Sequence, residues 1–208
     1  MKTLQLAFTS LLLVTAACGK KGGDSDGADL GTGIAIDPAA VNALVPAAFK
    51  DKLVFEKQDI ATDLGRSKTT YTLAFPKGWK RSGSEMFASF DAPSEAGLGF
   101  TTGMKVSANC GGECKPKDWT KVVDEYFQSI ISGGKVVKDV KGKTSRLLVA
   151  ETNGGNIEAT QVVYAWWTEG GKESYYCSAT IGAEGKDTAP AFEKACQAVA
   201  ITLTKTPR

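Results

Sequence analysis

Residues 156–181, NIEATQVVYAWWTEGGKESYYCSATI, contain the pattern that decides the fold of this chain. Two runs rich in β-branched and aromatic residues, Asn156–Thr168 and Glu173–Ile181, lie on either side of Gly170-Gly171. Two glycines between such runs are typical of a tight β-hairpin, because both central residues of the turn need a positive φ. The sequence therefore predicts an antiparallel hairpin whose turn lies at these two glycines.

The position of the turn fixes which side chains share a face of this hairpin. With Glu169 opposite Lys172, Cys177 lies opposite Tyr164. The face of Cys177 then also carries Val162, Tyr164, Trp166, Tyr175, Ala179 and Ile181, and the other face carries Gln161, Val163, Ala165, Trp167, Tyr176 and Ser178. If this second face is open, Trp167 and Tyr176 are exposed aromatics and form a candidate binding surface. If a helix covers it, the sheet has helices on both faces.

Further strands and two helices are expected along the chain. Strand-like runs occupy Leu53–Ile60, Thr69–Phe75, Met86–Phe90, Gly97–Val106 and Lys135–Glu151. Asp118 is a suitable N-cap for an amphipathic helix that ends at Gly133-Gly134, with an apolar stripe of Trp119, Val122, Val123, Tyr126, Phe127 and Ile130. A second helix is predicted from Thr188 to Thr204, with a buried stripe of Phe192, Ala195, Cys196, Val199 and Leu203. This mixture predicts an α+β domain.

The cysteines after residue 18 are even in number, as expected for disulfides in an exported domain. Cys110, Cys114, Cys177 and Cys196 allow three connectivities. We favour Cys110–Cys114 and Cys177–Cys196, because the second pair would hold the last helix over the Cys177 face of the sheet. The C-x3-C spacing of the first pair differs from the C-x-x-C of redox motifs, so we interpret it as a structural staple.

The first eighteen residues, MKTLQLAFTSLLLVTAAC, have the organisation of an export signal. Lys2 precedes an apolar stretch, and small residues stand directly before Cys18. The stretch is shorter than the ~20 residues that a membrane-spanning helix requires. The segment resembles a bacterial lipoprotein signal peptide with its lipobox. That resemblance implies that residues 1–17 are removed and that Cys18 is acylated.

The chain that follows Cys18 is rich in Gly and Asp up to Gly33 and offers almost nothing to bury. We therefore expect residues 18–36 to be the lipid-anchored cysteine and a flexible linker, and residues 37–208 to be a single domain. Gly19 stands where an Asp would resemble an inner-membrane retention signal, which favours the periplasmic side of the outer membrane. The inner membrane and the cell surface remain open alternatives.

Composition excludes several classes of function. The chain contains no histidine, which removes Ser-His and Cys-His nucleophile pairs and imidazole metal ligands. Its 25 basic and 23 acidic side chains nearly balance, so charge gives no reason to expect a nucleic-acid partner. We identify no catalytic residues, and we expect no metal and no cofactor.

One short motif and the order of the elements resemble a known family. Phe75-Pro76-Lys77-Gly78-Trp79 stands at the end of a predicted strand, within strands, a helix, three long strands and a closing helix. This combination resembles the PsbP-like superfamily, which includes extrinsic photosystem II subunits and Ran-binding Mog-type proteins. The resemblance implies an α/β/α sandwich around a curved antiparallel sheet over about residues 50–205, and a docking or assembly role without a catalytic constellation. Locally, Gly78 and Trp79 also suit a tight turn covered by a ring.

These observations favour a non-catalytic binding or docking domain, held at the cell envelope by a lipid anchor. Its partners would be the membrane, through the anchor, and an unidentified envelope protein or polymer. One alternative is a histidine-independent envelope hydrolase that uses carboxylates and a lysine. Another is a carrier of lipids or small molecules, since a curved sheet under helices can enclose a pocket.

Overall fold

The structure, a computed structural model, describes residues 27–63, 67–82, 88–99, 101–109, 118–154, 157–171 and 173–205. The strands are β1 (Gly27–Gly31), β2 (Phe55–Asp63), β3 (Ser67–Pro76), β4 (Lys80–Ser82), β5 (Ala88–Asp91), β6 (Gly103–Asn109), β7 (Gly134–Lys141), β8 (Ser145–Gly154), β9 (Ile157–Trp167), β10 (Ser174–Gly182) and β11 (Val199–Lys205). The α-helices are α1 (Pro38–Asn42), α2 (Trp119–Ser132) and α3 (Ala189–Gln197). Short 3-10 helices are η1 (Ala47–Phe49), η2 (Ser94–Ala96) and η3 (Ala183–Thr188). In these ranges, no helix is long and apolar enough to span a bilayer.

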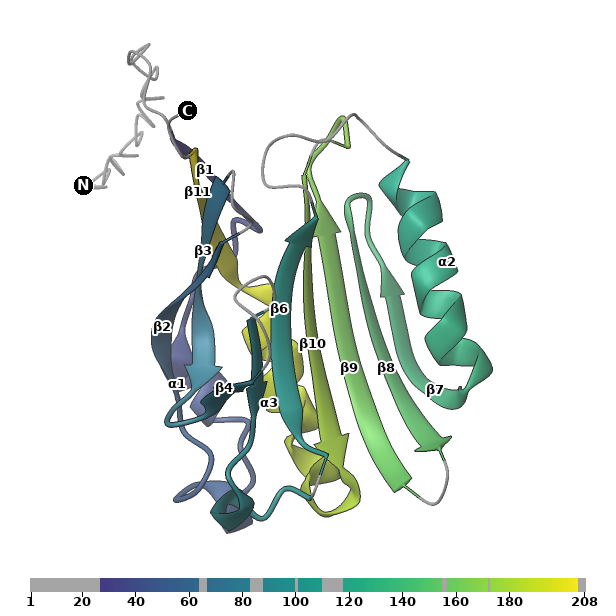
Figure 1. The fold of residues 1–208 in the computed structure, drawn as a ribbon. Helices are drawn as coiled ribbons and strands as arrows, with labels where there is room; N and C mark the ends of the chain where they lie inside the picture. The colour runs from purple at the N-terminus through teal and green to yellow at the C-terminus, as the bar shows by residue number, and fades with distance from the viewer. Residues whose placement is uncertain are drawn as a thin grey trace, which may run out of the picture.

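The larger sheet has seven strands in the order β4-β5-β6-β10-β9-β8-β7, all antiparallel (Figure 1). The predicted hairpin is its β9–β10 pair. Cys177 lies opposite Tyr164, and Gly170 and Gly171 have φ of +85° and +68°. The turn position and the register predicted from the sequence are therefore confirmed.

A second sheet of four strands, in the order β1-β11-β3-β2, faces the first one. Its inner residues alternate along β3, where Tyr71, Leu73 and Phe75 are fully buried. Tyr71 contacts Tyr175 of β10 across the two sheets, with ring centroids 5.9 Å apart. The α+β, sheet-dominated class is thus confirmed, but the strands divide between two sheets and do not form one curved sheet.

The helix predicted to run to Thr204 is wrong in its second half. Helix α3 ends at Gln197, and the chain continues as β11 between β1 and β3. The physical reason is the period-two pattern after α3: Val199, Ile201 and Leu203 are buried, while the residues between them face outward. Two neighbouring strands bond to both edges of this segment, which outweighs its helical spacing.

The prediction of a flexible linker over residues 18–36 is wrong at its C-terminal end. Residues 27–31 form β1, which pairs with β11 from Gly27 opposite Thr204 to Gly31 opposite Ala200. Thr32 continues this contact, because its N–H donates to the Val199 carbonyl at 3.0 Å. The described domain therefore begins before residue 37.

Helix α3 packs between the two sheets, against β3, β9 and β10 (Figure 1). Its Phe192 ring contacts Phe55 and Trp79, with centroids 5.3 and 5.7 Å away. The disulfide Cys177–Cys196 joins α3 to β10 and is fully buried, as predicted. Trp79 follows Gly78, whose φ is +76°, and its buried ring covers Phe75 at the end of β3. Packing therefore accounts for the Gly-Trp motif.

Candidate binding groove beside α2

Helix α2 covers the outer face of the seven-stranded sheet, which is the face turned away from α3 (Figure 1). It begins at Asp118, whose side chain accepts a hydrogen bond from the Lys121 N–H, as the predicted N-cap requires. One narrow line of the helix is buried: Trp119, Val123 and Phe127. This line forms a core with Leu148, Val163, Ala165 and Trp167 of β8 and β9. The helix therefore covers this face over β8 and β9, while the strip over β10 and β6 stays open.

Trp167 is therefore removed from the candidate binding surface that the sequence indicated. Only 7% of its surface is exposed, because the α2 side chains lie on it. The indole N–H of Trp119 donates to the Gly171 carbonyl at 2.6 Å, which ties the start of α2 to the β9–β10 turn. Tyr176, the other predicted surface residue, keeps part of its side chain exposed.

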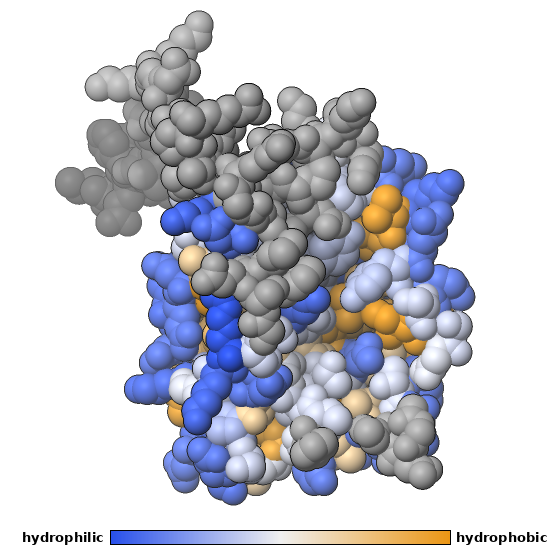
Figure 2. Space-filling model, in the orientation of Figure 1, coloured by the Kyte–Doolittle hydropathy of each residue, from blue (hydrophilic) through white to orange (hydrophobic). Residues whose placement is uncertain are grey.

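Beside α2, residues of β6, β9 and β10, and of β8 at one end, form the floor of an open groove, which we call the α2 groove. Its first part encloses about 260 Å³ and is lined by Val122, Tyr126, Val163, Tyr176, Ser178, Lys105 and Ser107. Its second part encloses about 420 Å³ and is lined by Ser129, Ile130, Gly133, Gln161, Thr180, Thr101, Thr152, Asn153 and Ala159. The two parts follow one another along α2 and β10. Figure 2 shows hydrophobic residues among weakly polar ones on the side of the molecule where α2 lies.

The middle of the α2 groove is marked by two tyrosine rings. Tyr126 of α2 meets Tyr176 of β10 edge to face, with centroids 5.7 Å apart and planes at 79°. Burial raises the pKa of Tyr176 to about 12, and the neighbouring Tyr126 adds to the shift. Burial also raises the pKa of Tyr126, although 46% of its side chain is exposed. Both phenols therefore stay protonated at neutral pH and can donate as well as accept hydrogen bonds.

Tyr126 is a groove residue that the sequence analysis missed, because it assigned this ring to the buried stripe. Two lines of residues at helical spacing run along this side of α2. Trp119, Val123 and Phe127 form the buried line, while Val122, Tyr126 and Ser129 form the line along the groove. The serine in the second line was the available signal, since a line facing a closed core would be apolar throughout.

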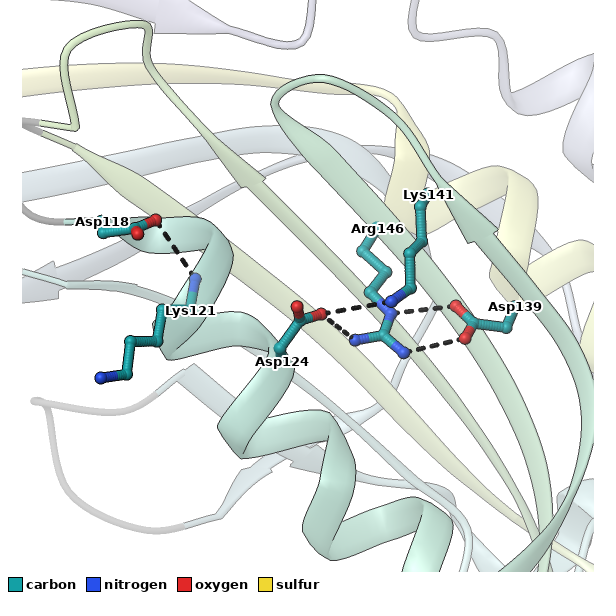
Figure 3. A network of polar contacts seen from close by, with 6 residues as sticks. All are labelled: Asp118, Lys121, Asp124, Asp139, Lys141 and Arg146. Atoms are coloured by element: carbon teal, nitrogen blue, oxygen red, sulfur yellow. Dashed lines mark hydrogen bonds and ion pairs between the residues drawn. The ribbon is translucent and has the colours of Figure 1, made fainter.

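A network of charged side chains joins α2 to β7 and β8 of the sheet (Figure 3). The guanidinium of Arg146 on β8 donates two hydrogen bonds to Asp139 of β7, at 2.9 and 2.8 Å. It also donates to Asp124 of α2 at 2.5 Å and lies 4.9 Å from the Phe127 ring centroid. Lys141 is the second cation near Asp124, at 3.5 Å. Only 6% of the Arg146 side chain is exposed, so its charge is balanced mainly by these carboxylates.

The shifted carboxylates in the described ranges behave as ion-paired anions. The hydrogen bonds and charge of Arg146 lower the pKa of Asp139, and those of Lys143 lower the pKa of Glu169. A general acid would require a shift in the opposite direction. In the same ranges, no three His, Cys, Asp or Glu side chains lie close enough together to hold a metal ion.

The remaining predicted site residues divide into two groups. Cys177 and Cys196 form the predicted disulfide, which is structural and buried. Cys18, Cys110 and Cys114 lie outside the described residues. The α2 groove is therefore the described surface at which the predicted residue Tyr176 meets side chains of three other elements.

The chain was compared with known proteins in two ways. No protein-family model matches it, and a search of curated proteins found no similar protein. The functional conclusion therefore depends on the shape and chemistry of the α2 groove.

Proposed function

We propose that this chain is a non-catalytic binding domain, tethered to a membrane of the bacterial cell envelope, which binds an extended segment of a partner protein in the α2 groove. The single observation that carries this proposal is the open strip of sheet beside α2, where Tyr126 and Tyr176 lie among serine and threonine hydroxyls. The charged network around Arg146 supports the proposal, because it fixes α2, the wall of the groove, to β7 and β8.

The dimensions of the groove suit an extended peptide. The α2 residues that line it run from Val122 to Gly133, which at about 1.5 Å per residue spans about 16 Å. An extended polypeptide advances about 3.3 Å per residue, so about five of its residues fit beside the helix. Side chains of such a segment alternate between two sides, and every second one would face the groove floor.

The composition of the groove favours a protein as the occupant. Tyrosine offers a large, rigid contact surface with a polar end, and small hydroxyl residues offer adaptable hydrogen bonds, a combination typical of protein-binding surfaces. In the first part of the groove, Tyr126 and Tyr176 lie beside Ser107 and Ser178. Val122 and Val163 add apolar surface between them. We therefore expect a segment with one apolar or aromatic side chain, flanked by polar residues.

Selection of peptides from a random displayed library against the detergent-solubilised full chain tests this proposal. Tyr126→Ala and Leu44→Ala remove side chains of similar exposure, 46% and 43%, the first in the groove and the second on the segment after α1. We expect Tyr126→Ala to weaken binding of the selected peptides about tenfold, as removal of an interface aromatic does, and Leu44→Ala to leave it unchanged. Equal affinity for both variants would contradict the assignment of the groove.

Photo-crosslinking in the native envelope tests the class of partner. A photoreactive amino acid at Ser129, which is exposed and lines the groove, is compared with the same amino acid at Leu44. We expect a protein adduct with the photoreactive amino acid at Ser129 and none with it at Leu44. The adduct should also be lost when the photoreactive amino acid at Ser129 is combined with Tyr126→Ala. An adduct that contains only glycan or lipid would show that the partner is not a protein.

The membrane tether is a proposal that rests on the first eighteen residues. Its support is the lipoprotein-like signal with Cys18 after small residues. Two or three acyl chains at about 0.8 kcal/mol per buried methylene would give stable anchoring. Gly19, which stands where an Asp would resemble an inner-membrane retention signal, favours the periplasmic side of the outer membrane. Labelled palmitate should be incorporated into the full chain and not into Cys18→Ser. A full-length, unlabelled precursor in the cytosol would exclude the tether.

We also propose a distant relationship in fold to the PsbP-like superfamily. It is supported by an antiparallel sheet with α2 on one face and α3 on the other, the arrangement that the resemblance implied. The four-stranded sheet on the α3 side is an addition to that arrangement. The test is the structure of a homologue intermediate in sequence between this chain and the superfamily. A homologue that keeps the strand order of the larger sheet and lacks the second sheet would support the relationship, and a homologue with a different strand order in the larger sheet would oppose it.

A further inference from the structure

We infer that β7 is a docking edge for a second copy of this chain, with the two β7 strands antiparallel around a two-fold axis at Val140. The inference is independent of the α2 groove, whose lining includes no β7 residue. In the paired form, Asp139 of each copy lies opposite Lys141 of the other, and the two seven-stranded sheets become one continuous sheet.

The position of β7 in the sheet makes its outer edge available. It is the last strand of the seven, after β8. Within the described part of the chain, no side chain bonds to the backbone of Asp139 or Lys141. The edge strand β2 of the other sheet is different, because the Asn42 amide bonds to both the N–H and the carbonyl of Phe55, and Arg81 donates to the Ala61 carbonyl at 2.9 Å.

The hydrogen-bonding pattern shows which residues of β7 face the open edge. The Gly142 N–H donates to the Ser145 carbonyl at 2.7 Å, at the start of the β7–β8 ladder. Bonded and non-bonded pairs alternate along an antiparallel ladder, so Val140 and Lys138 also direct their backbone groups toward β8. Asp139 and Lys141 then present their N–H and carbonyl groups to the open edge, where a second strand can bond to them.

Side-chain charge selects the register of the pairing. Asp139 and Lys141 lie on the α2 face, since Asp139 bonds to Arg146 and Lys141 pairs with Asp124. Residues directly opposite in a two-fold pairing must share a face. An axis at Asp139 would place the two Asp139 carboxylates opposite each other, and an axis at Lys138 would place the two Lys138 side chains opposite each other, so like charges would meet in both registers. An axis at Val140 instead forms two Asp–Lys pairs and leaves the valines opposite one another.

β7 contains lysines and a bulge, two features that prevent strand addition at many sheet edges, but neither blocks the register with its axis at Val140. Here Lys138 is held on the inner face by Glu193 of α3 at 2.6 Å, and Lys141 is held by Asp124. The irregularity of the β7–β8 ladder lies between Val136 and Lys138, so the segment from Lys138 to Lys141 follows it in regular pairing.

The exposed valines of β7 give a matched pair of probes. Val140 and Val137 are 51% and 56% exposed, unusually high for β-branched side chains in a strand. On the axis, the two Val140 residues form a non-bonded pair with Cα atoms about 4.5 Å apart, within the range of a disulfide. The two Val137 residues lie six strand positions apart across the axis, about 20 Å at 3.3 Å per residue, which no disulfide bridges.

Oxidative crosslinking of the detergent-solubilised full chain tests the inference, with the unsubstituted chain as the baseline for its native cysteines. We expect Val140→Cys to form a reducible dimer and Val137→Cys to stay at the baseline. A dimer yield for Val140→Cys no higher than for Val137→Cys overturns the inference. A strictly monomeric unsubstituted chain in sedimentation at 100 µM, a concentration chosen to reveal weak pairing, also overturns it.

A charge substitution tests the register in the Val140→Cys background. Lys141→Glu places a carboxylate opposite Asp139 of the second copy, and Lys141→Arg keeps the cation. Since two opposite-charge pairs become like-charge pairs, we expect Lys141→Glu to slow crosslinking roughly tenfold and Lys141→Arg to leave it unchanged. The Lys141 side chain is 60% exposed, so neither change threatens folding. Equal rates for the two variants would refute the proposed register.

Discussion

Asp139→Asn tests whether the network around Arg146 stabilises the packing of α2 against β7 and β8. The substitution keeps the shape of the side chain but removes its charge. It also turns one acceptor of the two Arg146 hydrogen bonds into a donor. Arg146 is left with Asp124 as its remaining carboxylate partner, in a site where 6% of the arginine side chain is exposed.

The expected cost follows from the geometry. Hydrogen bonds to charged groups contribute about 1.5–3 kcal/mol, and breaking a buried ion pair costs about 3–5 kcal/mol. Asp139 is 27% exposed and Asp124 is retained, so water and the second carboxylate offset part of this cost. We expect a loss of about 2 kcal/mol in the free energy of unfolding, from one lost charged bond. For a domain of this size, this loss corresponds to a fall of about 4–8 °C in Tm.

The assay is urea unfolding of the detergent-solubilised full chain followed by tryptophan fluorescence, with Glu125→Gln as the matched control. Glu125 also lies on α2 and pairs with a lysine, but its side chain and that of Lys121 are 70% and 74% exposed. The same carboxylate-to-amide change should therefore cost at most about 0.5 kcal/mol there. A cost for Asp139→Asn no larger than that of Glu125→Gln would refute the stabilising role of the network.

The pH dependence gives a second check on the same reasoning. Arg146 lowers the pKa of folded Asp139 below its ordinary value of 3.8, so its contribution to stability is complete well above that pH. As pH falls through 3.8 toward the lower folded pKa, the contribution is lost. The stability difference between the unsubstituted chain and Asp139→Asn should therefore narrow below pH 4. A difference that is constant down to pH 2 would mean that the charge of Asp139 is not its source.

Three further predictions concern the fold and the groove. Replacing both Cys177 and Cys196 with alanine should lower the free energy of unfolding by about 3 kcal/mol, the chain-entropy value for a loop of about 20 residues, and a change below about 1 kcal/mol in urea unfolding would contradict this. Gly170→Ala should cost about 1–2 kcal/mol in the same assay, because φ is +85° while the space around a new Cβ is empty; an unchanged midpoint would show that the turn relaxes. Tyr176→Phe should remove a tyrosinate absorbance step near pH 12, and persistence of that step would place the raised pKa on another residue.

Much of the fold could be predicted from short-range patterns. The two glycines of the β9–β10 turn fixed the register, and the register placed Cys177 on the inner face together with Tyr175 and Ile181. Asp118 identified the start of α2. These features depend on the local preferences of the backbone and on the period of apolar residues, which neighbouring residues alone determine.

The candidate site was less predictable because it depends on how widely α2 covers the sheet. The sequence singled out Trp167 and Tyr176 together, since both lie on the outer face of the hairpin. In the structure, α2 packs on Trp167 and leaves Tyr176 at the border, where it meets Tyr126. The residues of the hairpin do not determine where α2 lies across the sheet, or which hairpin side chains the helix covers.

The amino-acid order by itself determined the hairpin, the N-cap of α2 and the absence of imidazole chemistry, and it favoured the pairing of Cys177 with Cys196 without fixing it. Tertiary structure decided between a helix and a strand for the segment after α3, whose apolar residues fit both periods, because β1 and β3 supply hydrogen bonds to both of its edges. It also decided that Arg146 meets Asp124 and Asp139, which come from different elements of the chain. The physical reason is the range of the forces: turns, caps and periodicity act between near neighbours, whereas strand pairing and burial of charge depend on segments that only the folded chain brings together.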